Sequence, residues 1–443
     1  MRVSFLSEHS NTMHRGVTTL ALAAALALAP APALALEPLS AFLSAARSRS
    51  FDNREAAAVV GQRSAERDQS WLKLAPVATV SATYTRNQYE SIVTIPSGPT
   101  TFRTATITPQ DQGDLVLSAT VPLVDVGAWE RIGVANRSLE ASRSRAESTA
   151  SDVQKAVARD YYQLVAAAAL VEAAGSSLDT ARKNLAYVTS RKEAGVASEL
   201  DQKRAVAEVE RGRQSLADAT YQARIAERAL ATASGRVPTT DGASTLGDDL
   251  SPEAPLAEWD AGGADALPAV RAQRDEARAQ ERLASATRMA LVPSVAASAQ
   301  ERVTNAVGFG QQPYYAIAVG VTWRFDPSTF SAADAQTSVA VAARAREDRA
   351  RQQARDDIHN AWFAVARDLD KARSARAGLE ASTLASRIAS DRFAAGTASF
   401  LDVTTAERDA FSAKVTLIQA DADLAYARVA LRLAAGRSIG GAQ

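Results

Sequence analysis

The stretch Phe393–Asp402, which reads FAAGTASFLD, interrupts a sequence that is otherwise helical over long distances on both sides. Within it, a Gly is followed three residues later by a Ser and three residues after that by an Asp. The same spacing occurs at Gly195, Ser198 and Asp201, which lie 201 residues earlier. We therefore interpret the chain as two versions of one unit, each of which folds back on itself at this turn.

The offset of 201 residues is kept without a gap across much of the chain. It relates Asp125 to Asp326 at one end and Gly235 to Gly436 at the other. A register maintained over about 110 residues indicates duplication rather than chance.

Each turn is flanked by long helical stretches. Residues 128–193 contain no helix breaker except Gly133 and Gly175, and about 65 helical residues would span about 100 Å. Apolar residues recur there at seven-residue spacing: Leu164, Val171, Leu178 and Leu185. This spacing predicts a coiled-coil seam. We expect long helical hairpins over 128–235 and 330–436.

Each hairpin is preceded by two segments in which apolar and polar residues alternate. They cover about 77–85 and 115–123 in the first copy and about 295–303 and 315–323 in the second. A period of two predicts strands with two unlike faces, and their length fits strands that cross a membrane. We expect residues 87–112, which are polar and contain Pro and Gly, to form a loop.

The N-terminus has the pattern of a secretory signal. An apolar run, Val17–Ala29, is followed by prolines and then by the small residues of Ala33–Ala35. We expect a mature chain that begins near Leu36, with an Ala-rich membrane anchor as the alternative. Either Met1 or Met13 fits as the initiator. No later stretch looks long and apolar enough for a membrane-spanning helix.

These signals divide the chain into four parts. The expected boundaries are a signal peptide at 1–35, a first repeat at 36–235, a linker at 236–267 and a second repeat at 268–443.

Composition excludes several classes of function. Lys plus Arg and Asp plus Glu both number 50, so no net charge draws the chain to nucleic acid. There is no Cys, which excludes disulfides, thiolate metal sites and a lipid attached to an N-terminal Cys. His359 is the one His outside the signal segment, and no phosphate loop or nucleophile motif is present. We expect no enzyme and no bound cofactor or metal.

Four strands cannot close a conducting barrel, and an open strand edge in lipid is forbidden. Three copies would supply twelve strands, an even number within the range of outer-membrane barrels. The helical hairpins would then associate sideways into a hollow cylinder.

At this point the sequence resembles a family, the TolC-type outer-membrane factors (outer-membrane efflux proteins). The resemblance rests on the duplicated order of elements, on the G-x-x-S-x-x-D turn with Ala406 and Glu407 after it, and on the closing ALRLAAG. The junctions Pro122–Gly127 and Trp323–Asp326 also match. The resemblance implies a mixed α/β membrane protein, a homotrimer with a twelve-stranded β-barrel and a periplasmic α-helical barrel. It places the chain in the outer membrane of a Gram-negative bacterium.

The resemblance also implies a function and partners. The trimer would be embedded in outer-membrane lipid as an exit duct for small toxic molecules. It would dock on a periplasmic adaptor and an inner-membrane pump of RND, MFS or ABC type. A type I protein secretion duct uses the same scaffold and is an alternative. A structural coiled-coil surface protein is a remoter one, because a fibre has no use for the strand pairs.

The resemblance implies that Gly195 and Gly396 lie at the periplasmic tip, where the pore narrows. Asp402 matches the family's aperture Asp, which in a trimer forms a ring of carboxylates that attracts cations. The alternative is that Asp402 only caps the return helix. The position of a second ring in the prototype is Thr405 here, so we expect a single ring.

Asp201 matches an Asp that, in the best-known members, bonds to a Tyr and an Arg of the neighbouring turn. Those positions are Phe393 and Ala398 here, and neither can make the bond. Arg191 and Arg392, one turn before each Gly, are candidates to replace this latch. Alternatively, both are solvated charges on a helix face.

Overall fold

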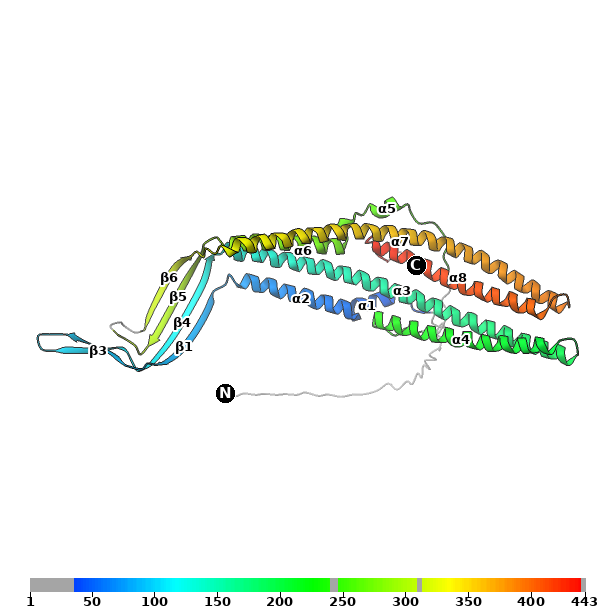
Figure 1. Cartoon of the computed structure of the whole chain (residues 1–443), viewed down its shortest axis with the longest axis horizontal. Helices are drawn as coiled ribbons and strands as arrows, with labels where there is room; N and C mark the ends of the chain where they lie inside the picture. The colour runs from blue at the N-terminus through cyan, green and yellow to red at the C-terminus, as the bar shows by residue number, and fades with distance from the viewer. Residues whose placement is uncertain (1–35, 240–245, 309–312, 440–443) are drawn as a thin grey trace, which may run out of the picture.

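The chain is elongated, with strands at one end and two helical hairpins whose tips lie together at the other (Figure 1). The computed structural model describes residues 36–239, 246–308 and 313–439. The expected signal peptide, residues 1–35, therefore lies outside the described residues.

The helical region consists of two long hairpins. In the first, α3 (Val126–Glu193) packs along α4 (Glu199–Ser234), and in the second, α7 (Ser328–Ala394) packs along α8 (Phe400–Ala434). The Asp125 carboxylate begins α3 by accepting a hydrogen bond from the backbone N–H of Ala128 at 2.8 Å. This is an ordinary N-cap, which satisfies a donor that the first helical turn leaves free.

The hairpins pack against each other mainly through α3 and α8. The heptad residues Leu164 and Leu178 are buried, as is the small residue Ala174 between them. One window of α3 is long and apolar enough to cross a membrane by length and composition, although we expected none. Its apolar side chains instead lie in clusters that α3 shares with α1, α4 and α8.

Shorter helices cover the halves of α3 and α7 that lie nearer the strands. These are α1 (Leu39–Arg49), α2 (Phe51–Leu72) and α6 (Pro268–Met289). α2 packs on α3, and α6 packs on both α3 and α7. α3 and α7 are therefore packed against α4 and α8 toward the tips, and against the shorter helices toward the strands (Figure 1).

The strands form one antiparallel sheet in the order β1 (Val77–Arg86), β4 (Asp111–Val124), β5 (Ser294–Thr304) and β6 (Tyr314–Thr322). One face is apolar and exposed, most clearly on β6: Tyr315 79%, Ile317 75%, Val319 67%, Val321 69%. The other face carries small and polar residues. There Arg302 Nε donates to Asp114 Oδ1 at 2.9 Å. β1 and β6 are the two edges of the sheet.

The expected loop at residues 87–112 was wrong in part. It contains a second hairpin, β2 (Ser91–Pro96) paired with β3 (Phe102–Thr108), and β4 begins at Asp111. The two strands are rich in Thr, Ile, Val and Phe, which favour β structure, whereas the Pro and Gly that indicated a loop lie in and beside the turn between them.

The linker between the copies contains α5 (Leu256–Asp260) and a short 3-10 turn (Ala264–Ala266). Residues 246–255, which we call the strap, lie against the second hairpin. Arg428 of α8 contacts Asp248 and Glu253, and its Nη2 donates to the Ser251 carbonyl at 2.7 Å. Trp362 Nε1 of α7 donates to the Ala254 carbonyl at 3.0 Å. The strap is thereby fastened to both helices of the hairpin.

Candidate functional site at the hairpin tips

Both tip turns begin with the same helix C-cap. Gly195 has a φ of +76°, its N–H donates to the Lys192 carbonyl at 2.9 Å, and the Val196 N–H donates to the Arg191 carbonyl at 2.9 Å. This is a Schellman motif, which favours Gly because other residues resist the left-handed conformation. Gly396 has the same φ of +76°. The Gly of the repeated motif is therefore required by the left-handed backbone conformation at this position.

Both turns end with a capping box. Ser399 is the N-cap of α8, and Asp402 Oδ2 accepts hydrogen bonds from the Ser399 N–H and Oγ–H, each at 2.8 Å. Ser198 and Asp201 repeat the arrangement, with Oγ to Oδ2 at 2.6 Å. Asp402 therefore caps the return helix as the partner of the N-cap Ser399, three residues on, rather than as the N-cap residue itself.

Asp402 is exposed despite this role. The Ser399 N–H and hydroxyl hold the pKa of Asp402 below its usual range, and the positive charge of Arg392 adds to the effect. Thr405, one turn further along α8, is exposed as well. Asp201 contacts Ser198 and, at 3.9 Å, Arg204 of its own helix, and within the described part of the chain it makes no bond to the second hairpin.

The two tips share a small apolar core, which we call the tip cluster. Its members come from both hairpins: Leu185, Val188, Ala197, Ala205, Phe393 and Phe400. The Phe393 and Phe400 rings lie 5.7 Å apart, and the Tyr187 ring meets Phe393 edge-on at 5.9 Å. Apolar packing therefore joins the tips at Phe393, one of the two positions whose side chains cannot form the polar latch.

Arg191 adds a polar contact between the tips. Its Nη1 donates to the Tyr187 hydroxyl at 3.2 Å and to the Phe393 carbonyl at 3.4 Å. Its guanidinium lies 5.1 Å from the centre of the Phe393 ring, a cation–π distance. Arg392, its repeat equivalent, is exposed and has no side-chain hydrogen bond or ion pair to another described residue. Of these two equivalent arginines, Arg191 contacts the other hairpin, whereas Arg392 has no hydrogen bond or ion pair with a described residue of it.

Two more polar contacts join the hairpins further from the tip, and sequence reasoning missed both. Asn184 Nδ2 of α3 lies 2.8 Å from each carboxylate oxygen of Glu407 in α8. Beside it, Arg408 Nε donates to Glu208 Oε2 of α4 at 3.2 Å. Glu407 stands in the Ala- and Glu-rich segment after the turn, but nothing in the sequence identified its partner.

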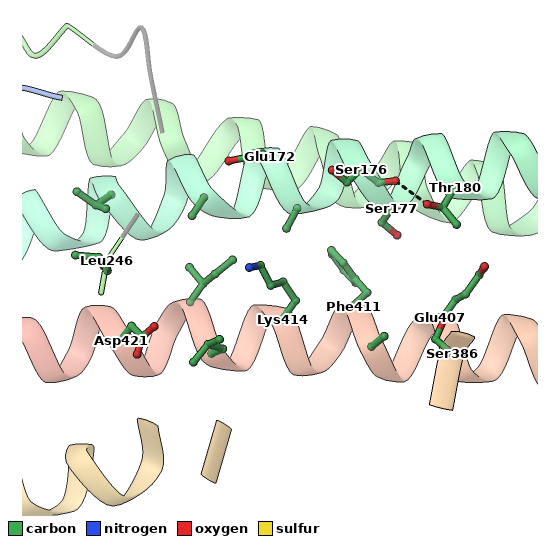
Figure 2. Close-up of a pocket in the computed structure, with 16 residues that line it drawn as sticks. Glu172, Ser176, Ser177, Thr180, Leu246, Ser386, Glu407, Phe411, Lys414 and Asp421 are labelled. Atoms are coloured by element: carbon green, nitrogen blue, oxygen red, sulfur yellow. Dashed lines mark hydrogen bonds between the residues drawn. The ribbon is translucent and has the colours of Figure 1, made fainter. Parts of the chain in front are cut away.

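A cavity of about 620 Å³ lies between α3 and α8. Figure 2 shows Phe411, Lys414 and Glu407 reaching from α8 toward the Ser176–Thr180 segment of α3. The remaining residues that line the cavity are mostly apolar. Because the cavity lies between α3 and α8, the two hairpins are in incomplete contact over this length.

A comparison with known protein families matches the chain in two segments, one for each repeat. The model of the outer membrane efflux protein family matches residues 42–236 and 263–437. The fold is similar to the solved outer-membrane channel OprN (22% identity, 90% of each chain covered, TM-score 0.72). It is also similar to CusC (17%, 90% of this chain and 92% of that one, 0.76). Another similar structure is the open-state MtrE outer membrane channel of Neisseria gonorrhoeae (20%, 91% and 90%, 0.71). A search of curated protein sequences found no significant match.

Proposed function

The chain belongs to the outer membrane efflux protein family, and on this premise we propose that three copies form an exit duct for small toxic molecules. The family consists of efflux channels of the outer membrane and not of enzymes. In this assembly the sheets form a twelve-stranded barrel, and the helical hairpins form a tunnel that extends into the periplasm. Residues 36–235 and 268–443 are its two repeats, and 236–267 is the linker between them.

The observation that carries the proposal is the sheet with one exposed apolar face and two free edges. An apolar face of this size suits lipid, whereas the opposite face carries the Arg302–Asp114 pair and suits a water-filled lumen. Backbone groups along β1 and β6 have no strand partner on their outer sides among the described residues. Pairing β6 of one copy with β1 of the next satisfies these groups, and the antiparallel order of the sheet continues.

The tips are the proposed aperture. Three copies of Asp402 form a carboxylate ring that attracts cations, while Thr405 adds no second ring. Asp201 holds its own turn, and Phe393 with Arg191 holds the two hairpins of one copy together. The Ser399 hydrogen bonds, with a smaller contribution from the charge of Arg392, favour the ionised form of Asp402. A periplasmic adaptor docks at this end and links the duct to an inner-membrane pump of RND, MFS or ABC type.

We expect protein extracted from outer membranes to migrate as a trimer in mild detergent and as a monomer after heating. The interstrand hydrogen bonds of a closed barrel resist detergent, so dissociation requires heat. Electrophoresis of unheated and heated samples measures this. A water-soluble monomer that does not change its mobility on heating would contradict the proposed assembly.

The aperture assignment predicts that Asp402→Asn weakens the block of ion current by multivalent cations several-fold in planar bilayers. The amide oxygen still accepts from the Ser399 N–H, so the turn is kept while three negative charges are lost. Because the pKa of Asp402 is lowered, wild-type block should persist in mild acid and fade only below about pH 4.

Asp201→Asn is the matched control, since it makes the same change in the same capping box of the first hairpin. Cation block that is equally weakened by both substitutions, or by neither, would contradict the ring at Asp402.

A further inference from the structure

Glu407 is a carboxyl group held between the two hairpins by one neutral partner. Both of its oxygens lie 2.8 Å from Asn184 Nδ2, and the side chain is half-buried between α8 and α3. Within the described chain no Lys or Arg forms an ion pair with it. A half-buried carboxylate without a cation is disfavoured relative to the neutral acid.

The charged groups around Glu407 do not compensate for its burial. From α4 it faces Glu208, another carboxylate, to which the nearby Arg408 and Arg211 are paired. From α8, Lys414 lies two turns further along the cavity wall, and α7 contributes the neutral Ser386 (Figure 2). α3 contributes Ser177 and Thr180, together with Glu172 at the far side of the cavity. No element packed here therefore offers Glu407 a free positive charge at close range.

The direction of the pKa follows from this geometry. Burial raises the pKa of Glu407, the Asn184 hydrogen bonds lower it in part, and the charge of Glu208 raises it further. The pKa is thus higher in the packed arrangement than it would be if the hairpins separated and exposed Glu407 to water. Acid therefore favours the packed hairpins, and this preference is lost as the pH rises through the raised pKa.

We propose that Glu407, half-buried between α3 and α8 beside Asn184, is an acid-strengthened clasp: its neutral form favours packing of the two hairpins of a protomer, and its ionised form loosens them. The clasp rests on the proposed function, since it regulates the aperture of that duct. Protonation removes the cost of a buried charge, and this gain outweighs the weaker hydrogen bonds that Asn184 then donates, so the packed hairpins of the closed aperture are favoured in acid. No ligand or additional subunit is needed for this response.

The test uses full-length trimers in planar bilayers at about pH 5 and about pH 8, both above the ordinary pKa of Glu, about 4.3, so that only a raised pKa gives a difference between them. Wild-type conductance should be several-fold lower in acid. Glu407→Gln, which is permanently neutral, should show the low conductance at both pH values. Glu172→Gln changes an exposed carboxylate of the same cavity and should keep the wild-type response. Asp423→Asn removes another α8 carboxyl whose pKa is raised by burial, and it too should leave the response in place.

A second measurement applies even if a variant conducts poorly. The chain has no Cys, so Ser177→Cys places a single thiol in the cavity wall. At about pH 8 its maleimide labelling should be several-fold slower when Glu407→Gln is also present, because the neutral side chain keeps the hairpins packed. Equal labelling, or an acid response retained by Glu407→Gln, would overturn the clasp. Wild-type trimers that conduct equally at both pH values would overturn the clasp and leave the duct standing, whereas absence of any conductance would overturn the duct itself.

Discussion

Arg428→Ala should lower the free energy of unfolding of the helical region by about 3 kcal/mol, the largest effect we expect from one substitution. The Arg428 side chain is 15% exposed, and its partners Asp248 and Glu253 are 17% and 15% exposed. Its Nη1 lies 2.5 Å from Glu253 Oε1, and its Nε lies 2.9 Å from Asp248 Oδ2. Removal of the guanidinium leaves two largely buried carboxylates without a cation, so the strap should detach from α8.

Thermal unfolding followed by circular dichroism measures this loss. Arg428→Lys keeps the charge but not the fork-shaped donor, and should have an intermediate effect. Arg224→Ala is the control, because its ion pair with Glu227 lies within one helix, with the Arg side chain 73% exposed, and should change stability by less than about 0.5 kcal/mol. If the Arg428 and Arg224 substitutions cost the same, the strap does not depend on this ion pair.

Arg191→Ala should release the tips of the two hairpins and raise the conductance of the reconstituted channel. The substitution removes one hydrogen bond and one cation–π contact across the hairpins, together with a hydrogen bond to Tyr187 in its own helix. Contacts of these kinds contribute about 1–2 kcal/mol together, which shifts an open–closed equilibrium by a factor of roughly 5–30. Single-channel recording measures the open fraction directly.

The duplication supplies the control for Arg191. Arg392 occupies the equivalent place in the second hairpin but lacks a cross-hairpin contact within the described residues. Arg392→Ala should therefore leave the open fraction close to that of the wild type. If both substitutions open the channel equally, general loss of positive charge at the tip explains the result, and the latch assigned to Arg191 is wrong.

Patterns confined to neighbouring residues were readable from the sequence. The spacing of Gly, Ser and Asp in each turn reflects a Schellman motif followed by a capping box, which involve residues no more than a few positions apart. The period of two in β1 and the heptads of α3 likewise depend on local geometry. The β2–β3 hairpin was missed because its Pro and Gly residues were given more weight than its β-branched ones.

Contacts between the hairpins could not be read in this way. Arg191 and Phe393 are separated by 202 residues, and Asn184 and Glu407 by 223. Each pair meets only because two long helices pack at a particular rotation about their axes. Sequence spacing along one helix defines which side chains share a face, but not which face of another helix it meets. For the same reason Arg191 and Arg392 looked equivalent in the sequence, although one lies between the tips and the other is exposed.

The sheet has a consequence for how the protein reaches its final state. A four-stranded sheet with free edges at β1 and β6 and an exposed apolar face is an aggregation hazard in water and carries unsatisfied backbone groups in lipid. The strands must therefore stay shielded during transit across the periplasm, and their last hydrogen bonds form when copies meet in the membrane. Insertion and oligomerisation are thus one thermodynamic event, so the stability of the barrel depends on protein concentration and has no meaning for a single chain.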